Sequence, residues 1–327
     1  NRGATTRDED FLEYMVVATN HQYMLFFTEK GKCFWMRVFE IPEGSKTSKG
    51  RAIQNLINIE PDDKVRAYIR THDLMDEEYV NNNYVIMVTK KGVVKKTSLE
   101  AYSRPRVNGI NAITIREGDQ LLEAKLTDGK SEIMIASLSG KAIRFEDAKV
   151  RPMGRTASGV RGINLGSEDN EVIGMIVIRD KENETVLVVS EKGYGKRSSI
   201  EDYRITNRGG KGVTTLNITE KTGKLIAIQS VTDNDDLMII NKSGVTIRTG
   251  VKEMRVMGRA TQGVRLINLK KNDEIAAVAK VAMEEEVDMD ENEMENPMLN
   301  NVNSETNGSD VDNSSDENLN LDSNNEE

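Results

Sequence analysis

Two series of glycines recur along this chain at steps close to fifty residues. The members of the first series are Gly31, Gly92, Gly140, Gly193 and Gly244, and those of the second are Gly50, Gly109, Gly159, Gly212 and Gly263. Each glycine of the first series lies between two runs rich in β-branched or apolar residues. A repeat of this length built from strands predicts an array of small sheets, one blade per repeat, rather than a helical solenoid.

The repeat can be read strand by strand. Residues 84–89 and 93–97 are two β-branched runs joined by Lys90-Lys91-Gly92, which suits a hairpin whose glycine takes a positive φ. We expect a third strand after each hairpin and a fourth, such as residues 171–178, that closes the unit. The expected third strands are residues 110–115, 160–165, 213–218 and 264–269. Four strands per unit is the size of a propeller blade.

Five such blades are expected, at residues 19–80, 81–129, 130–182, 183–233 and 234–280. Residues 1–18 read as the remnant of an earlier blade, because 14–18 resemble a closing strand. The sequence has no initiator Met, no signal peptide and no apolar run long enough to span a membrane, so we expect a piece of a longer cytoplasmic protein. Its single cysteine, Cys33, admits no internal disulfide and is interpreted as a buried apolar residue.

Charge divides the chain into two parts. Residues 281–327 hold 16 of the 54 acidic residues and none of the 45 Lys and Arg. This composition predicts a disordered acidic tail. The first 280 residues therefore carry a net charge of +7, although the whole chain has −9. The chain average thus conceals a basic sheet domain that suits a polyanionic partner.

The positive charge concentrates in the loop between each hairpin and the strand that follows. The basic residues of these loops are Lys46, Lys49 and Arg51; Arg104 and Arg106; Arg151, Arg155 and Arg161; Arg204, Arg208 and Lys211; and Arg255, Arg259 and Arg265. Repetition should place them alike on every blade, as a belt around one rim. Such a belt can follow the phosphates of a DNA duplex without reading bases. The alternative is that they are ordinary solvated loop charges.

Three of the loops have a tighter form. Residues 151–155 and 255–259 share the pattern Arg-x-Met-Gly-Arg, and the third reads Asn207-Arg208-Gly209-Gly210-Lys211-Gly212. Glycines let the backbone approach a phosphate closely, and successive amides can form an anion-binding nest. These glycines are equally consistent with tight turns that need a positive φ, and the two interpretations are compatible.

The third loop resembles the glycine- and arginine-rich box of DNA gyrase A subunits, the family to which we compare this chain. The box usually reads Gln, basic, Arg, Gly, Gly, basic, Gly, and residues 208–212 match it, whereas Thr206 and Asn207 stand where Gln and a basic residue are usual. The runs 6–11, 24–31, 40–42 and 50–53 look like further landmarks of the C-terminal region of that protein. The resemblance covers about residues 4–280.

This resemblance implies an all-β, six-bladed β-pinwheel, a propeller variant whose blades exchange strands, with the first blade mostly missing here. It implies that the domain wraps double-stranded DNA and works with the gyrase B protein and a second gyrase A protein, near the nucleoid. That complex is a type II topoisomerase that introduces negative supercoils, with ATP and Mg²⁺ acting through gyrase B. The family usually carries its box in the first blade, so the copy at Arg208 is either the working box or an echo of it in a later repeat.

No enzyme site emerges from the residues themselves. Gly129-Lys130-Ser131 lacks the earlier glycine of a nucleotide-binding loop, and His21 and His72 have no cysteine partners for zinc. Asp8-Glu9-Asp10 reads as a solvated turn, and packing is the expected role of Tyr102 and Tyr203, which occupy equivalent repeat positions. The family's DNA-cleaving tyrosine lies N-terminal to the pinwheel, so we expect this segment to be non-catalytic.

Two rival functions stay open. One is the C-terminal domain of topoisomerase IV, which lacks a good box and commonly has fewer or irregular blades. The other is a protein-binding propeller, against which stand the basic loops and the absence of a repeated Trp-Asp signature, since Trp35 is the only tryptophan.

Overall fold

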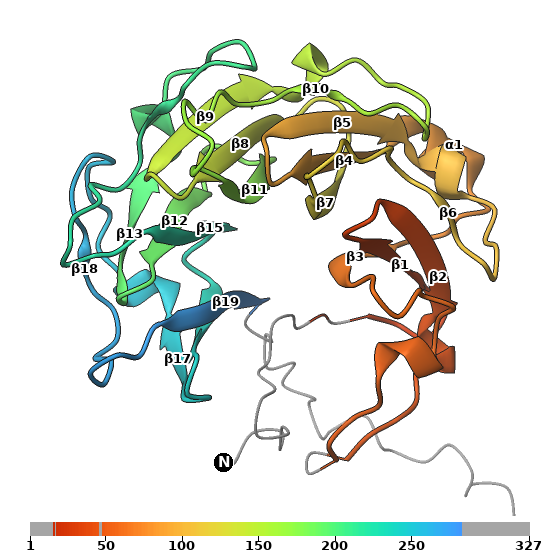
Figure 1. Ribbon diagram of the computed structural model, residues 1–327, viewed down its shortest axis with the longest axis horizontal. Helices are drawn as coiled ribbons and strands as arrows, with labels where there is room; N and C mark the ends of the chain where they lie inside the picture. The colour runs from red at the N-terminus through yellow and green to blue at the C-terminus, as the bar shows by residue number, and fades with distance from the viewer. Residues whose placement is uncertain (1–15, 17, 46–47, 283–327) are drawn as a thin grey trace, which may run out of the picture. The chain divides into compact units, whose positions relative to one another are not determined.

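The computed structural model describes residues 16, 18–45 and 48–282. These residues form five antiparallel sheets, which follow one another in chain order in Figure 1. The expected remnant blade at 1–18 and the expected tail fall almost entirely outside the described residues. The all-β propeller expectation is confirmed. Five sheets are described rather than six blades, and the last strand continues to Ala282, two residues beyond the expected boundary.

Four of the sheets have four strands, and the fifth has three. The first sheet has the order β3 (Val65–Thr71), β1 (Tyr23–Thr28), β2 (Lys32–Arg37), β6 (Ile110–Asn111). The second has the order β7 (Leu121–Thr127), β4 (Tyr84–Thr89), β5 (Val93–Ser98), β10 (Val160–Arg161). The third has the order β11 (Val172–Ile178), β8 (Glu132–Ser137), β9 (Lys141–Glu146), β14 (Val213–Thr214). The fourth has the order β15 (Leu225–Val231), β12 (Thr185–Ser190), β13 (Tyr194–Ser199), β18 (Val264–Arg265), and the fifth β19 (Ile275–Ala282), β16 (Asp235–Asn241), β17 (Thr246–Gly250).

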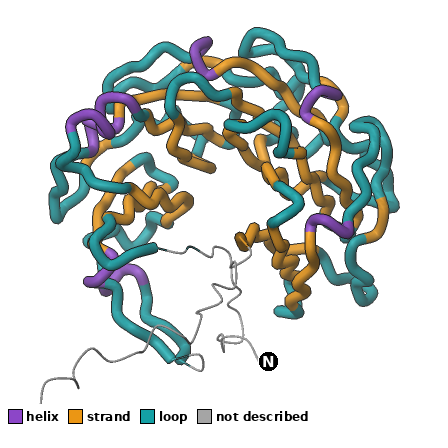
Figure 2. Tube along the Cα trace, turned by 180° about the vertical axis from the view of Figure 1, so that it is seen from behind, coloured by secondary structure: helices purple, strands orange, loops and turns teal. Residues whose placement is uncertain are grey.

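Helical segments are short and lie mostly near the perimeter (Figure 2). They are α1 (Glu77–Asn82) and the 3-10 turns η1 (Val38–Glu40), η2 (Ile53–Asn55), η3 (Leu99–Tyr102), η4 (Asp147–Lys149), η5 (Ile200–Asp202) and η6 (Val251–Glu253). The turns η3 to η6 directly follow the second strand of a hairpin, at the outer side of the sheets. No pattern in the sequence indicated α1, whose N-cap Asp76 accepts a hydrogen bond from the Tyr79 amide.

The hairpins were predicted correctly, but the third strands were not. Gly31 and Gly92 take positive φ values of 86° and 85° in their turns, as expected. The segments expected as third strands of their own sheets form only two-residue strands, and each pairs with the preceding sheet. For example, β10 pairs with β5 through Val160↔Val94 and Arg161↔Val93. Strand exchange, which was only implied by the family resemblance, is thus observed at four successive junctions.

Apolar side chains fill the spaces between neighbouring sheets. Leu25 and Phe27 of β1 pack with Val85 and Met87 of β4 in one buried cluster. The alternate residues Ile86 and Val88 face the next sheet, because successive side chains of a strand point to opposite faces. The central strands are buried on both faces, which explains their almost continuous apolar sequence.

Both glycine series mark the junctions between repeats. A Cβ on Gly140 would lie 2.4 Å from the Leu216 carbonyl oxygen of the next repeat, and one on Gly212 would lie 2.4 Å from the Ala142 carbonyl oxygen of the preceding sheet. Gly50 is the first member of the second series and Gly244 the last member of the first, and at both no atom of the described residues lies within 4 Å of the equivalent point. They are the positions that lack a preceding or a following described repeat. The periodicity therefore arises from close backbone approach between blades.

Gly140 and Gly244 provide a matched test of this interpretation. Their φ values are 77° and 84°, so alanine at either site bears the left-handed backbone cost of roughly 1–2 kcal/mol. Gly140→Ala should lose a further ~1–3 kcal/mol, because its methyl group overlaps Leu216 and Ile218. Denaturant unfolding of both variants checks this, and equal losses would contradict the junction role of Gly140.

Candidate nucleic-acid interface

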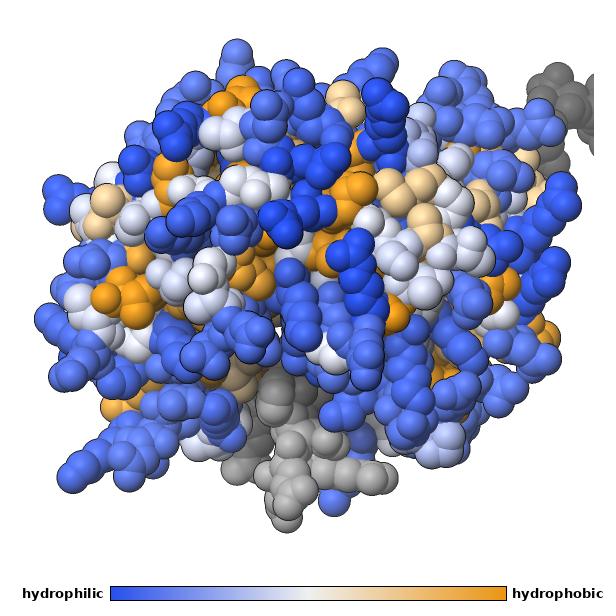
Figure 3. Space-filling view, turned by 45° about the horizontal axis from the view of Figure 1, so that its top comes forward, coloured by the Kyte–Doolittle hydropathy of each residue, from blue (hydrophilic) through white to orange (hydrophobic). Residues whose placement is uncertain are grey.

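The basic loops lie along the outer edges of the sheets. Three of them are bonded to the outer hairpin strand of the preceding sheet through one backbone hydrogen bond each. The donors are the amides of Met153, Thr206 and Met257, and the acceptors are the carbonyls of Lys96, Arg144 and Arg197, at 2.8, 2.9 and 2.8 Å respectively. A two-residue strand follows each of these loops and continues the docking. Figure 3, which turns the upper perimeter of Figure 1 forward, shows mainly hydrophilic side chains there with small apolar patches between them.

Most of the expected DNA-contacting cations are exposed and unpaired. Within the described residues, nine of them make no side-chain hydrogen bond or ion pair: Lys49, Arg51, Arg104, Arg106, Arg151, Arg161, Arg204, Lys211 and Arg255. They come from all five basic loops, so the sheets present them in series along their outer edges. Lys46 lies outside the described residues. Exposed guanidinium and ammonium groups without internal partners are suited to phosphate oxygens.

Three other expected DNA contacts have a structural role. Arg155, Arg208 and Arg259 occupy equivalent positions, and their guanidinium groups donate to the carbonyls of Asn111, Arg161 and Thr214 at 3.3, 3.1 and 2.9 Å. Each acceptor belongs to the two-residue outer strand one repeat earlier. These arginines therefore connect successive outer strands, although each guanidinium keeps donors that could reach a ligand.

A fourth expected DNA contact, Arg265, packs over the Tyr194 ring, 5.4 Å from its centroid, and donates to the Tyr194 hydroxyl at 2.9 Å. This hydrogen bond, together with nearby cationic charge, lowers the pKa of the Tyr194 hydroxyl. Arg265 is thus held by an aromatic neighbour rather than by a backbone carbonyl.

The glycine-rich loop combines packing and exposure. The Gly209 amide donates to the Gly162 carbonyl at 2.7 Å, so it is not available to a phosphate, and Gly212 abuts Ala142 as described above. The tight-turn interpretation thus holds for these two glycines. Gly210, Lys211 and Arg204 are exposed and remain candidate DNA contacts.

Sequence reasoning missed a row of donors that connect the sheets. In the first four repeats, the residue four positions after the hairpin glycine reaches the 3-10 turn of the next repeat or the residue after it. Trp35 donates to the Tyr102 carbonyl at 2.9 Å, and Arg197 to the Met254 carbonyl, just after η6, at 2.7 Å. Lys96 binds the Asp147 carboxylate at 2.5 Å with both side chains almost fully buried. A donor at a fixed offset from each glycine was the sequence signal for this row.

Arg144 is the most fully engaged member of the row. Its guanidinium donates to the carbonyls of Ile200 and Tyr203 at 2.9 and 2.7 Å and pairs with Glu132 at 2.6 Å. Arg248 occupies the same offset in the last repeat, where it is exposed and, within the part of the chain that the structure describes, pairs only with Asp236 at 2.6 Å. The donors therefore act at junctions between repeats.

Cys33 is fully buried, and burial raises the pKa of its thiol well above the ordinary value, as expected for a packing residue. Tyr102 and Tyr203 are also buried, and the Tyr203 hydroxyl lies 2.5 Å from Thr215 Oγ1. Among the described residues, no cluster of His, Cys, Asp and Glu is arranged to hold a metal. No helix in the described ranges has the length and apolar character needed to cross a bilayer.

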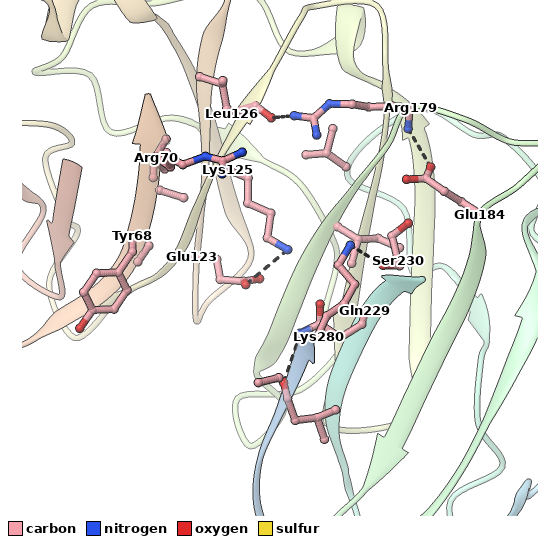
Figure 4. A pocket seen from close by; sticks show the side chains of 17 residues that line it. Tyr68, Arg70, Glu123, Lys125, Leu126, Arg179, Glu184, Gln229, Ser230 and Lys280 are labelled. Atoms are coloured by element: carbon pink, nitrogen blue, oxygen red, sulfur yellow. Dashed lines mark hydrogen bonds and ion pairs between the residues drawn. The ribbon is translucent and has the colours of Figure 1, made fainter. Parts of the chain in front are cut away.

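The inner strands surround a polar cavity of about 510 Å³, lined by residues of β3, β7, β11, β15 and β19 (Figure 4). Several of its cations are engaged locally. Lys280 donates to the Ser230 carbonyl at 3.1 Å, Arg179 to the Leu126 carbonyl at 2.6 Å, and Lys125 lies 3.7 Å from Glu123. The inner cavity thus differs from the outer edge, where most basic loop residues have no such partners in the described part of the chain.

Comparison with known proteins gives one family and several similar relatives. A family model described as DNA gyrase C-terminal domain, beta-propeller, matches residues 22–70, 83–128, 131–179, 184–232 and 235–282. The DNA gyrase A protein of Staphylococcus aureus strain NCTC 8325 / PS 47 is 42% identical over 292 residues, which are 89% of this chain and 32% of the relative. That of strain MRSA252 is 43% identical over 280 residues, 86% of this chain and 31% of the relative. The chain spans about a third of the length of these relatives.

Two solved structures are similar to the structure of this chain. The C-terminal domain of DNA topoisomerase IV has a TM-score of 0.71 and 26% identity, over 80% of each chain. A DNA gyrase A C-terminal domain has a TM-score of 0.69 and 22% identity, over 85% of this chain and 92% of that one. The second likeness establishes the fold alone.

The junction donors predict unequal costs for two arginine substitutions. Arg144→Met should lose about 2–4 kcal/mol of unfolding free energy, because it leaves the carbonyls of Ile200 and Tyr203 without this donor and leaves Lys181 as the remaining cation paired with the buried Glu132 carboxylate. Arg248→Met removes a pair whose arginine side chain is exposed, so that water can replace the guanidinium beside Asp236, and it should lose about 1 kcal/mol or less. Urea unfolding of the two variants measures both, and a small loss for Arg144→Met would contradict the connecting role.

Proposed function

We propose, since this chain belongs to the family of DNA gyrase C-terminal β-propeller domains, that it binds double-stranded DNA along the outer edges of its sheets and wraps it. The observation that carries the proposal is the set of nine exposed cations that have no internal partner among the described residues and that all five basic loops supply. Phosphates follow one another along a duplex at ~1.7 Å per charge, so a curved series of cations can neutralise many of them without base contacts. Such wrapping would be largely independent of sequence.

DNA wrapping by this domain would serve the activity of a larger complex. We propose that wrapping supports negative supercoiling by a heterotetramer of two gyrase A and two gyrase B proteins, in the cytoplasm. ATP and Mg²⁺ would act through gyrase B, and DNA cleavage would use a tyrosine outside this segment. The domain itself supplies binding energy and DNA curvature. A topoisomerase IV role is less well supported, because the curated relatives at 42–43% identity are DNA gyrase A proteins.

A sixth blade also belongs to this proposal. Strand β17 has no outer strand beside it in the described residues, whereas β2, β5, β9 and β13 each have one. Gly50 likewise has no atom of a described residue within 4 Å of its expected Cβ position. Both are junction surfaces of the kind that a further repeat covers elsewhere.

The binding proposal predicts a salt dependence set by exposed arginines. Log affinity for a mixed-sequence duplex should fall linearly with log salt, with a slope of about −0.9 per neutralised phosphate. Arg151→Ala with Arg255→Ala should flatten that slope by up to about two units at unchanged stability, because neither side chain has an internal partner among the described residues.

Lys125→Ala with Lys280→Ala is the matched control, since it removes the same charge from the inner cavity. The control should leave the slope unchanged. Equal slopes for wild type and the Arg151, Arg255 double variant would place DNA elsewhere on the molecule.

The loop at 204–212 is proposed to fix the wrap. Arg204→Ala with Lys211→Ala, made in the full-length gyrase A protein, removes its two exposed cations without touching the Arg208 contact to Arg161. Supercoiling of a relaxed plasmid with gyrase B and ATP should be lost, whereas relaxation and cleavage should remain, because these reactions use the catalytic core.

The Arg151, Arg255 double variant carries the same charge change on two other loops and should still supercoil the plasmid. Robust supercoiling by the Arg204, Lys211 variant would mean that this loop is an echo of the box rather than its working copy.

A further inference from the structure

Two lysines are buried directly beneath basic loops. Lys95 and Lys196 lie three residues after a hairpin glycine, and they are 0% and 1% exposed. The equivalent residues of the other repeats are apolar: Phe34, Ile143 and Ile247. The loops above the two lysines are the two that share the pattern Arg-x-Met-Gly-Arg, at 151–155 and 255–259. A buried lysine and this loop pattern therefore occur together.

Lys196 is held entirely by neutral oxygens of the loop. Its ammonium nitrogen donates to the Gly258 carbonyl at 2.6 Å, to the Thr261 carbonyl and hydroxyl at 3.1 Å each, and to the Arg259 carbonyl. Three carbonyls of one turn thus converge on a single positive charge. A buried ammonium without a carboxylate is costly unless such acceptors surround it.

Lys95 repeats the arrangement with fewer acceptors. Its ammonium donates to the carbonyls of Ala112 and Arg155 at 2.6 and 2.5 Å. On one side of the loop, the Met153 amide is bonded to the Lys96 carbonyl, and on the other side Val160 pairs with Val94. The lysine therefore holds the middle of a loop whose two ends are already docked.

The converging carbonyls determine where the loop amides point. In a trans peptide the C=O and N–H groups point in opposite directions, so the amides of Arg259, Ala260 and Gln262 point away from the ammonium. None of these three amides has an acceptor among the described residues. Arg255, at the start of the same loop, is exposed and has no partner in the described part of the chain. Outward amides beside a free guanidinium form a phosphate-binding arrangement.

We propose that Lys196 and Lys95 are positioning residues for DNA, each beneath a loop that carries the Arg-x-Met-Gly-Arg pattern. Lys196 holds three carbonyls of its loop inward and Lys95 holds one, that of Arg155, so that the amides that follow these carbonyls and the first arginine of the loop face the phosphates. This inference rests on the proposed function. The lysines do not touch DNA themselves, and their effect passes through the loops. The loop at 204–212 lies over Ile143 and lacks this device.

The two buried lysines lose their proton at a pH that binding experiments can reach. Burial lowers the pKa of both ammonium groups to about 8, assisted by Arg155 near Lys95 and by Arg259 near Lys196, where Asp202 acts in the opposite direction. The other titratable groups around them are Cys33, Tyr102 and Tyr203, whose pKa values burial raises. A neutral amine has only two N–H donors and a lone pair that repels carbonyl oxygens. The inward hold on the turn is therefore weakened above pH 8.

Stability should change in the opposite direction from binding. Folding lowers the pKa of each lysine from 10.5 to about 8. Between these two pH values, the lysine is therefore protonated in the unfolded chain and neutral in the folded chain. In this window the unfolded state binds more protons, so the unfolding free energy rises with pH. A loss of DNA affinity there, without a loss of stability, separates positioning from unfolding.

The test measures the affinity of a mixed-sequence duplex and the urea midpoint at pH 7 and pH 9, at constant salt. Wild type should lose about tenfold in affinity per loop between these values, equivalent to one charge-assisted hydrogen bond, while its urea midpoint rises rather than falls. Lys95→Met and Lys196→Met should each bind about tenfold more weakly at pH 7. The double variant should show a flat pH profile. Lys125→Met, which removes one charge from β7, should bind and titrate like wild type.

Wild-type affinity that is constant from pH 7 to pH 9, or that falls together with the urea midpoint, overturns the positioning role without any variant. Methionine variants that retain the wild-type pH profile overturn it as well. Comparison with the double variant removes the titration of other groups, such as the α-amino group. Failure of wild type to bind the duplex at pH 7 would instead overturn the proposed DNA-binding function.

Discussion

Close contact between the backbone of one repeat and the hairpin of the preceding repeat is the constraint on which this fold depends. The carbonyl of Gly140 accepts hydrogen bonds from the amides of Thr215 and Leu216, and the same turn leaves no space for a Cβ. A two-residue strand and a long donor side chain such as Arg144 then complete each junction. Every described sheet but the last is thus finished by residues of the following repeat, which couples neighbouring blades through backbone bonds as well as apolar packing.

Cations serve two purposes in this domain, and their burial separates them. Lys96, Arg144 and Arg197 are buried and donate to groups of the next repeat, whereas Arg151, Arg204 and Arg255 are exposed and have no internal partner in the described part of the chain. Arg155, Arg208 and Arg259 fall between these classes, because they connect outer strands yet stay partly exposed. A count of basic loop residues therefore overstates the number free to bind phosphate.

The two buried lysines extend this relation between fold and surface. An ammonium ion beneath a loop costs desolvation, yet it satisfies carbonyl groups that would otherwise converge without a donor. Because the carbonyl groups point inward, the amide groups of the loop point outward. A buried residue thus determines which backbone groups the outer edge of the blade exposes. Apolar residues at the equivalent positions, such as Ile143, are accompanied by loops of different sequence.

The sequence by itself determined the repeat, the hairpins and the series of basic loops, because local turn chemistry and alternating apolar residues need only neighbouring positions. It also indicated that Cys33, Tyr102 and Tyr203 are packing residues. It assigned residues 110–115 to the wrong sheet, since the pairing of Ile110 with Cys33 joins segments that no local pattern relates. Only the tertiary structure decided which arginines are free and which connect strands: Arg151 and Arg155 lie in one loop, but the acceptor for Arg155 is supplied by Asn111 of an earlier repeat. The burial of Lys196 beneath Arg259 was likewise decided by how two repeats dock, because an exposed and a buried lysine look alike in a sequence.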